Sequence, residues 1–480
     1  GNTMTFSGAI GSDQALAGLT ITQSDGATFA STLDITDGSS GTFTVTDTED
    51  GSDITFNGAV TFETVSFAAA GYDLVFNGSG NTFTNAVTFQ NTGTLNLGDA
   101  SGDTFVFDAG LTESTTGTVT LAGSIDSSND DITFGAITLA AATNIDTNAT
   151  DTNGDIIIGA VTGANNNLTL DTTATTGSAD ITFNGDINLG TGVLDVTGDV
   201  VLGANVTLTT TKSSGNGIII RDAINADSAS SNDRTLTLNS GTGSAIFALG
   251  NIGASEALAG LTVTQSAGVS FSGSVDVSDS NSGTITLTDT TDGANITFSG
   301  AVTADTFTTA AQGYNIILNG DATFANAVTF QNTGTLDLGN ATSDTLTFNG
   351  GVTESTSGTV TIDGAIVSSD DAISFGAISL GQDLSVTSAG GAITIGAITS
   401  SAARDVTITS SGGSTNTVTL STLSGGNMNT IAVTGSTSVT LNGNITTNNS
   451  SGNSVTITGT TINTGAITID TNNTSNDGAI

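Results

Sequence analysis

The 480-residue sequence contains no proline, cysteine, histidine or tryptophan. At an ordinary usage of about 5%, roughly two dozen prolines would be expected. Proline is common in the turns and edge strands of sandwich-type all-β domains, so its absence argues against that class. Without cysteine there is no disulfide framework and no thiolate metal site, and the chain is indifferent to an oxidising environment.

Positive charge is also scarce, because Lys and Arg number four against 45 Asp and Glu, which gives a formal net charge of −41. Such a charge repels phosphate backbones and anionic lipid headgroups, so we expect no nucleic-acid partner and no direct membrane insertion. No stretch approaches the roughly 20 apolar residues that span a bilayer. Charged residues are only 10% of the chain, and Val, Ile and Thr are abundant, so we expect it to fold.

These absences leave few groups for catalysis. The four cations, Lys212, Arg221, Arg234 and Arg404, are scattered singly. Polysaccharide-cleaving β-helices use a basic residue or a tight set of carboxylates in one cleft, whereas the carboxylates here recur with a repeat. We therefore expect no enzymatic activity and no required cofactor.

The main feature that is present is a repeat of about 240 residues. The run 85–95 recurs unchanged at 326–336, an offset of 241. The only two tyrosines, Tyr72 and Tyr314, are equivalent at an offset of 242, so one residue is deleted near Asp321. Long self-similar periods are typical of repeat architectures.

The repeat predicts two solenoid units, 1–245 and 246–480, the second continuous with the first. Repeat arrays normally end in atypical polar capping segments. Both ends of this sequence cut through the repeating pattern instead. We therefore expect the 480 residues to be a segment of a longer chain.

A shorter module recurs inside each unit, in which two strand-like runs flank a glycine, as in 54–61, 132–139 and 181–188. Apolar and polar residues alternate with period two, which indicates strands with one buried face. Modules follow one another at about 20 to 25 residues, a suitable length for one coil of a β-solenoid. The alternative is an antiparallel all-β array with hairpin turns.

Asn-Gly pairs recur at the expected corners of the coils. Glycine there would supply a positive φ, and the asparagine amides could form ladders between coils. The pairs are Asn57-Gly58, Asn184-Gly185, Asn319-Gly320, Asn349-Gly350 and Asn442-Gly443.

The stretches 217–227, 234–239 and 257–263 resemble the very large repetitive bacterial exoproteins of the filamentous-haemagglutinin-like, two-partner-secretion and autotransporter types. The resemblance covers essentially the whole chain and rests on composition and loose repeats. It implies an all-β fold, a right-handed parallel β-helix, and secretion to the bacterial cell surface as an adhesin, matrix or filament component. The amino-terminal secretion-recognition region of that group has no counterpart here.

Two surface features are candidates for binding. Asp146, Asp151, Asn153 and Asp155 offer the hard oxygen ligands that Ca²⁺ prefers, and a second acidic cluster lies at 47–53. Neither matches an EF-hand loop or the calcium-binding nonapeptide repeat, and solvated acidic turns are the alternative. Threonine-rich strands could form hydroxyl ladders like those of ice-binding solenoids, but their spacing along the sequence is irregular.

The sequence therefore predicts a structural protein, the shaft of an extracellular fibre or matrix on the bacterial cell surface. We expect its partners to be copies of itself or further repeats joined end to end. The alternative is an adhesin whose loops bind surface glycans or a host or neighbouring cell. Such a site should appear as a non-repeated, aromatic-rich insertion, and none stands out.

Overall fold

A computed structural model describes residues 2–38, 40–115, 117–148, 154–173, 178–228, 234–278, 283–356, 358–412, 416–424, 428–448 and 454–471. In these residues the backbone forms strands, bridges, turns and bends, and no helix. The chain divides into unit 1 (Gly1–Phe247) and unit 2 (Ala248–Ile480). Strand β29 (Ala245–Ala248) lies at the boundary.

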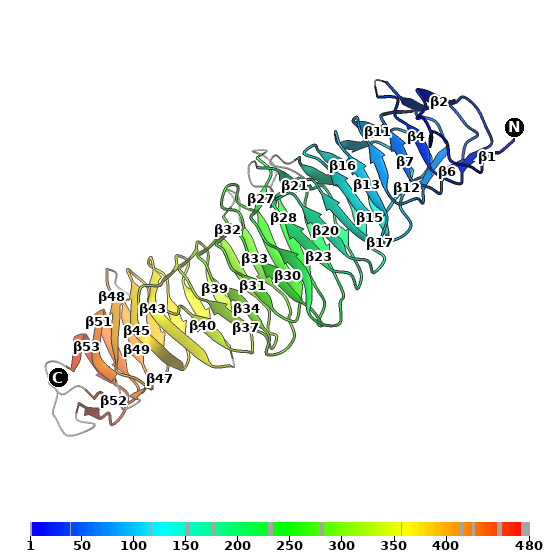
Figure 1. Ribbon diagram of the computed structural model, residues 1–480. Coiled ribbons are helices and arrows are strands. Elements are labelled where there is room, and N and C mark those ends of the chain that lie inside the picture. Colours follow the sequence, from blue (N-terminus) through cyan, green and yellow to red (C-terminus); the bar gives the residue numbers. More distant parts are fainter. Residues whose placement is uncertain are drawn as a thin grey trace. The chain divides into compact units, whose positions relative to one another are not determined.

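Each unit is a stack of coils, and each coil contributes one strand segment to each of three faces, here named A, B and C. Ile54 pairs with Leu74 of the next coil on face A, and Phe62 pairs with Phe83 on face B. The chain contains about 18 such coils of about 24 residues each (Figure 1). The strand pairs of the described residues are parallel, and hairpin turns cannot connect parallel strands. The predicted parallel β-solenoid is therefore confirmed.

The three faces of unit 1 contain strands β1 to β28. Face A consists of β1 (Met4–Phe6), β3 (Ala27–Phe29), β6 (Asp53–Phe56), β9 (Asp73–Phe76), β12 (Leu95–Leu97), the first parts of β15 (Val119–Ser127) and β17 (Ile137–Asp146), β19 (Val161–Thr162), β22 (Ile187–Asn188), β25 (Val206–Thr209) and β28 (Thr235–Asn239). Face B consists of β4 (Leu33–Ile35), β7 (Val60–Phe62), β10 (Asn81–Phe83), β13 (Thr104–Phe107), the later parts of β15 and β17, β20 (Leu168–Asp171), β23 (Leu194–Thr197) and β26 (Asn216–Ile220). Face C consists of β2 (Gly18–Ile21), β5 (Thr42–Val45), β8 (Thr64–Phe67), β11 (Val87–Phe89), β14 (Leu111–Glu113), β16 (Ile132–Phe134), β18 (Ile156–Ile158), β21 (Asp180–Phe183), β24 (Asp199–Leu202) and β27 (Ile224–Ala226).

Unit 2 repeats this arrangement with strands β30 to β54. Face A consists of β31 (Val269–Phe271), β34 (Asn295–Phe298), β37 (Asn315–Leu318), β40 (Leu336–Leu338), the first parts of β43 (Val360–Ser368) and β45 (Ile378–Ser388), β47 (Ile398–Ser400), β50 (Leu423–Ser424), β52 (Ile445–Thr446) and β54 (Ile469–Asp470). Face B consists of β32 (Val275–Val277), β35 (Val302–Ala304), β38 (Ala322–Phe324), β41 (Thr345–Phe348), the later parts of β43 and β45, β48 (Arg404–Ser410) and the first parts of β51 (Met428–Leu441) and β53 (Val455–Asn463). Face C consists of β30 (Gly260–Gln265), β33 (Thr284–Leu287), β36 (Thr306–Thr309), β39 (Val328–Phe330), β42 (Val352–Glu354), β44 (Ile373–Phe375), β46 (Ile393–Ile395), β49 (Thr417–Leu420) and the later parts of β51 and β53.

The core of each unit is a set of inward side chains stacked coil upon coil. Phe29, Phe56 and Phe76 of unit 1 stack with ring centroids 5.1 and 4.6 Å apart, close to the separation of neighbouring strands. The equivalent residues Phe134 and Phe375 are 2% and 3% exposed, so both point inward as predicted. Parallel pairing therefore brings like residues into contact, because register aligns the same position of successive coils.

The glycines of the Asn-Gly corners correct one prediction, since none of the five has a positive φ. They are needed because successive corners approach closely. A Cβ on Gly58 would lie 2.4 Å from the carbonyl carbon of Ser31, and one on Gly350 would lie 2.3 Å from the nitrogen of Ala327. Positive φ is found at other glycines, such as Gly98.

At one Asn-Gly corner the predicted amide contact between coils is present. The side-chain amide of Asn77 donates a hydrogen bond to Oδ1 of Asn57, one coil earlier, at 3.1 Å. In unit 2 a similar contact lies at strand starts rather than at an Asn-Gly corner, where the amide of Asn315 in β37 donates to Oδ1 of Asn295 in β34 at 2.8 Å. These contacts add to the backbone ladder at the edge of the strands.

Candidate functional site

The structure places the predicted calcium ligands Asp146 and Asp155 in different columns. Asp146 ends β17 on face B, and its Oδ1 accepts a hydrogen bond from the backbone N–H of Asn148 at 2.8 Å. Asp155 precedes β18 on face C, and its Oδ1 accepts from the N–H of Asp180 at 3.0 Å. The other two candidates, Asp151 and Asn153, lie outside the described residues.

Asp146 belongs to a column of three carboxylates that sequence reasoning missed. Asp126 pairs with Asp146, and Asp146 pairs with Asp171, on three consecutive coils. Neighbouring strands are about 4.8 Å apart, so the three side chains lie close together on face B. Their spacings of 20 and 25 residues differ, and only the register aligns them.

Burial and mutual repulsion affect this acidic column. Desolvation raises the pKa of Asp126, although a hydrogen bond from Ser124 at 2.7 Å opposes the rise. Desolvation also raises the pKa of Asp146, as do the charges of Asp171 and Asp126, whereas the Asn148 N–H lowers it. A pocket of about 340 Å³ lies beside Asp126 and Asp146. The column can therefore attract protons or cations.

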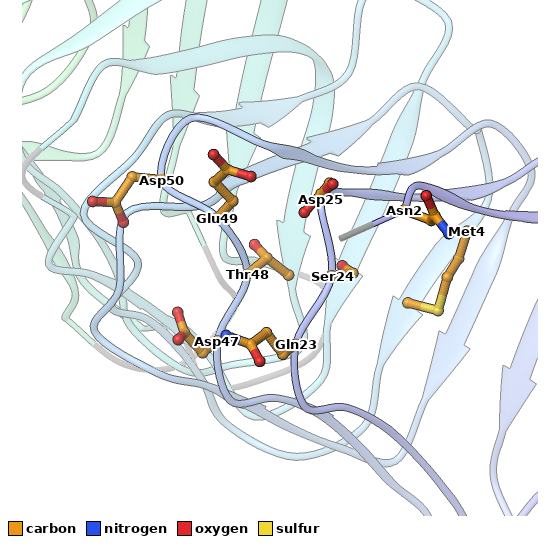
Figure 2. A pocket seen from close by; sticks show the side chains of 9 residues that line it. All are labelled: Asn2, Met4, Gln23, Ser24, Asp25, Asp47, Thr48, Glu49 and Asp50. Atoms are coloured by element: carbon orange, nitrogen blue, oxygen red, sulfur yellow. The ribbon is translucent and has the colours of Figure 1, made fainter.

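The second acidic cluster surrounds a pocket of about 590 Å³ in unit 1. Figure 2 shows the carboxylates of Asp25, Asp47, Glu49 and Asp50 spread around the pocket rather than meeting at one point. Within the described part of the chain, no three His, Cys, Asp or Glu side chains converge as a metal site. Asp53, predicted with this cluster, lies on β6 and does not line the pocket.

Many acidic corner residues bind backbone N–H groups of an adjacent coil. Asp131 accepts from the N–H of Asp155 at 2.9 Å, and Asp199 accepts from Ala223 at 3.0 Å. In unit 2, Asp383 accepts from Asp405 at 3.0 Å. Hydrogen bonds to ionised acceptors are stronger than neutral ones. This role supports the alternative interpretation, in which the acidic turns are structural.

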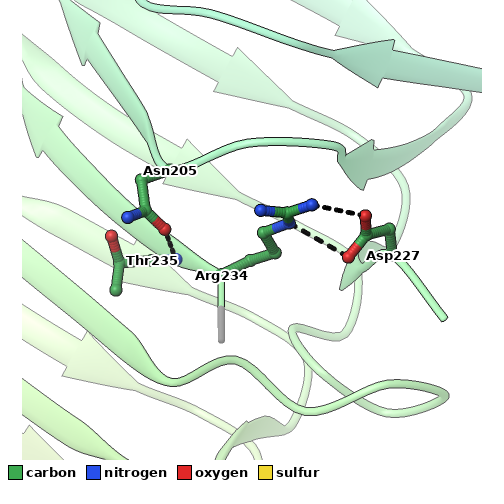
Figure 3. A network of polar contacts seen from close by, with 4 residues as sticks. All are labelled: Asn205, Asp227, Arg234 and Thr235. Carbon is green, nitrogen blue, oxygen red and sulfur yellow. Dashed lines mark hydrogen bonds and ion pairs between the residues drawn. The ribbon is translucent and has the colours of Figure 1, made fainter. Parts of the chain in front are cut away.

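The three arginines are engaged inside their own units. Arg234 makes two hydrogen bonds to Asp227, at 3.0 Å from Nε and 2.7 Å from Nη2, as Figure 3 shows. Arg221 lies 2.7 Å from Asp195. Arg404 donates to Oε1 of Gln382 at 3.2 Å. These contacts give each arginine a structural role.

Face C of unit 2 carries a hydroxyl column, an outward file of threonine and serine residues on consecutive coils. Its intervals along the sequence vary from 20 to 25 residues, which is why the spacing looks irregular before the register is known. No member is charged, so the column adds nothing to the negative potential of the chain. The members are Thr262, Thr286, Thr308, Thr329, Thr353, Ser374, Thr394, Thr419 and Thr440.

Comparison with protein-family models, with curated proteins and with solved structures finds no match for this chain. The described residues include no helix with the length and apolarity needed to cross a membrane. The stacked parallel coils make the chain a repeat β-solenoid.

Proposed function

We propose that this chain is a structural shaft of a secreted bacterial fibre or extracellular matrix, of the kind formed by the large repetitive exoproteins. The observation that carries the proposal is the unbroken register of face C in unit 2, where one file runs through nine consecutive coils. Acidic side chains such as Asp131, Asp199 and Asp383 hold adjacent coils together by accepting hydrogen bonds from backbone N–H groups.

The physical basis of the shaft is the direction of its hydrogen bonds. Strands run around the coil, so backbone hydrogen bonds run along the stack. Pulling two coils apart must break the bonds of three faces together. A core of stacked phenylalanines and aliphatic residues adds burial that is also shared between coils. Such a stack supplies length and stiffness without any catalytic group.

The test is the length of the particle as units are added. Chains with one, two and three copies of the 240-residue unit should be imaged by negative-stain electron microscopy. Each unit has about nine coils of about 4.8 Å, so each should add roughly 45 Å to a particle of constant width. Separate bodies joined at variable angles would contradict a continuous shaft.

A binding measurement distinguishes the adhesin alternative from the proposed shaft. The same chains should be screened against surface glycans and against intact cells. A shaft is expected to show no saturable binding, whereas saturable binding abolished by substitutions in one coil corner would replace this proposal with the adhesin one. Antibody labelling of intact source cells tests the proposed surface location.

A further inference from the structure

Each unit carries one glutamate at an inward-facing position of its wall. Glu113 ends β14, where it pairs with Phe89 of the preceding coil, and Glu354 ends β42, where it pairs with Phe330. On the other side, Thr112 of β14 pairs with Thr133 of the following coil. The next residue there is the buried Phe134, which therefore lies beside Glu113. The carboxyl group thus occupies one position of an inward file, and phenylalanine fills the same position in the neighbouring coil.

Both glutamates close the corner of the next coil. Oε2 of Glu113 accepts a hydrogen bond from the N–H of Gly135 at 3.0 Å, and Oε2 of Glu354 accepts from Gly376 at 2.9 Å. The two sites differ in burial: Glu113 is 8% exposed, whereas Glu354 is partly exposed. Oε1 of Glu113 is buried and has no hydrogen-bond partner.

The surroundings of Glu113 contain no cation, and the groups that favour its ionised form are the backbone N–H groups of Gly135 and Thr115. The strands packed against β14 are β11 and β16, whose residues Val-Thr-Phe and Ile-Thr-Phe include no titratable group. Asp108 and Asp131 are the acids that precede β14 and β16 in the sequence, at the opposite ends of these strands from Glu113. All four cationic side chains are described, and Glu113 forms an ion pair with none of them.

We propose that Glu113 is a proton-operated latch that closes the corner at Gly135 when its carboxyl group is protonated and loosens it when the proton is lost. The neutral acid removes an unpaired charge from an apolar wall and keeps Oε2 as the acceptor for Gly135. Loss of the proton leaves a carboxylate with a buried oxygen that lacks a partner, which is costly.

The sign of the pH effect follows from burial. Desolvation raises the pKa of Glu113, and the N–H groups of Gly135 and Thr115 offset only part of the rise. The folded chain therefore keeps a proton over a pH range in which the unfolded chain has lost it. The contribution to stability is fully present below the ordinary glutamate pKa and is lost as pH rises through the raised value.

The direct test is a carboxyl titration. The sequence contains only five glutamates, so labelling Glu with ¹³C at the side-chain carboxyl gives five NMR signals. The signal of Glu113, assigned with Glu113→Gln, should titrate above the ordinary range for glutamate. A midpoint inside that range would overturn the proposal. If Glu113→Gln does not fold, Glu→Gln variants at the other four positions assign the signal by elimination.

The latch itself is tested by amide hydrogen exchange at Gly135, corrected for the intrinsic rate. Protection should fall as pH rises, by up to about ten-fold per pH unit between the two glutamate midpoints. Glutamine keeps an acceptor for Gly135, so Glu113→Gln should abolish this dependence, and Glu354→Gln should leave it unchanged at Gly135. A pH dependence that persists in Glu113→Gln would show that general charge repulsion loosens the corner, and the latch would be rejected.

Discussion

At the scale of single residues, the acidic side chains fall into two groups. Corner acids such as Asp131 and Asp383 accept hydrogen bonds from backbone N–H groups of the next coil and so join neighbouring coils. The acidic column Asp126–Asp146–Asp171 instead stacks like charges on neighbouring strands. The hydrogen bonds of the first group stabilise the solenoid, whereas the like charges of the second group destabilise it.

Replacing Asp146 by asparagine should therefore stabilise the chain at pH 7. Asn keeps an acceptor for the Asn148 N–H and removes one charge from the column, a change of about 0.2–1 kcal/mol by the range for cross-strand pairs. The raised pKa of Asp146 means that wild-type stability falls as pH rises above the ordinary aspartate value, so the gain should vanish in acid.

The measurement is urea unfolding of both proteins at pH 7 and at pH 3. Asp13→Asn is the control variant, because it also removes one negative charge but at an exposed bend. A variant that is less stable than wild type at pH 7, or equally shifted at both pH values, would contradict the repulsive column.

Corner glycines have a separate role at this scale, because a side chain there would collide with backbone. Gly78→Ala should cost about 1–3 kcal/mol in unfolding free energy, since its Cβ would lie 2.2 Å from the Gly58 oxygen. Gly102→Ala is the control, because no atom lies within 4 Å of its Cβ position. Thermal unfolding should separate the two; equal effects would mean that corner spacing is not limiting.

At the scale of elements, the one-residue difference between the units has a local compensation. In unit 1 the inward side chain of Asn81 accepts from the N–H of Val60 at 3.2 Å and donates to the carbonyl of Thr104 at 3.2 Å. In unit 2 the carbonyl of Asp321 accepts from the equivalent Val302 N–H at 2.9 Å, and Ala322 fills the wall. A side chain thus replaces a main-chain acceptor where the corner is longer.

This exchange predicts an asymmetric pair of variants. Asn81→Ala should destabilise unit 1 by about 1–3 kcal/mol, because the buried N–H of Val60 loses its acceptor. Replacing residues 79–81 by the Asp-Ala of unit 2 removes the same asparagine but restores a main-chain acceptor, so most of the stability should return. Urea unfolding of both variants is the check. Equal losses would show that the acceptor is not what Asn81 supplies.

At the scale of the whole molecule, the three arginines are held in folded structure. Arg221 and Arg234 pair with aspartates, and Arg404 lies in β48. Trypsin needs locally unfolded chain at these residues, and strands paired on both sides open rarely. We expect an essentially intact band after prolonged digestion of the native protein, and cleavage at all four sites after heat unfolding. Rapid native cleavage at Arg404 would contradict continuous stacking in unit 2.

The net charge of −41 should also control association between copies. Like-charged copies repel at low salt, and divalent cations screen or bridge that repulsion. We expect light scattering to increase when millimolar Ca²⁺ is added and to reverse with chelator. The Asp126→Asn, Asp146→Asn double variant should need more Ca²⁺ if the acidic column is a bridging point. No change across the titration would remove Ca²⁺ as a ligand.

The sequence alone determined the strands, their inward faces and the repeat, because alternation and glycine corners are local and recur at a length that suits one coil. It also placed Phe134 and Phe375 in the core and an asparagine contact at the Asn57 corner. Only the tertiary structure decided which outward residues are neighbours. Coils differ in length, so residues such as Asp126, Asp146 and Asp171 become a column only through hydrogen-bond register. For the same reason Glu113 looks like an ordinary polar residue in sequence, although its strand turns it into the wall.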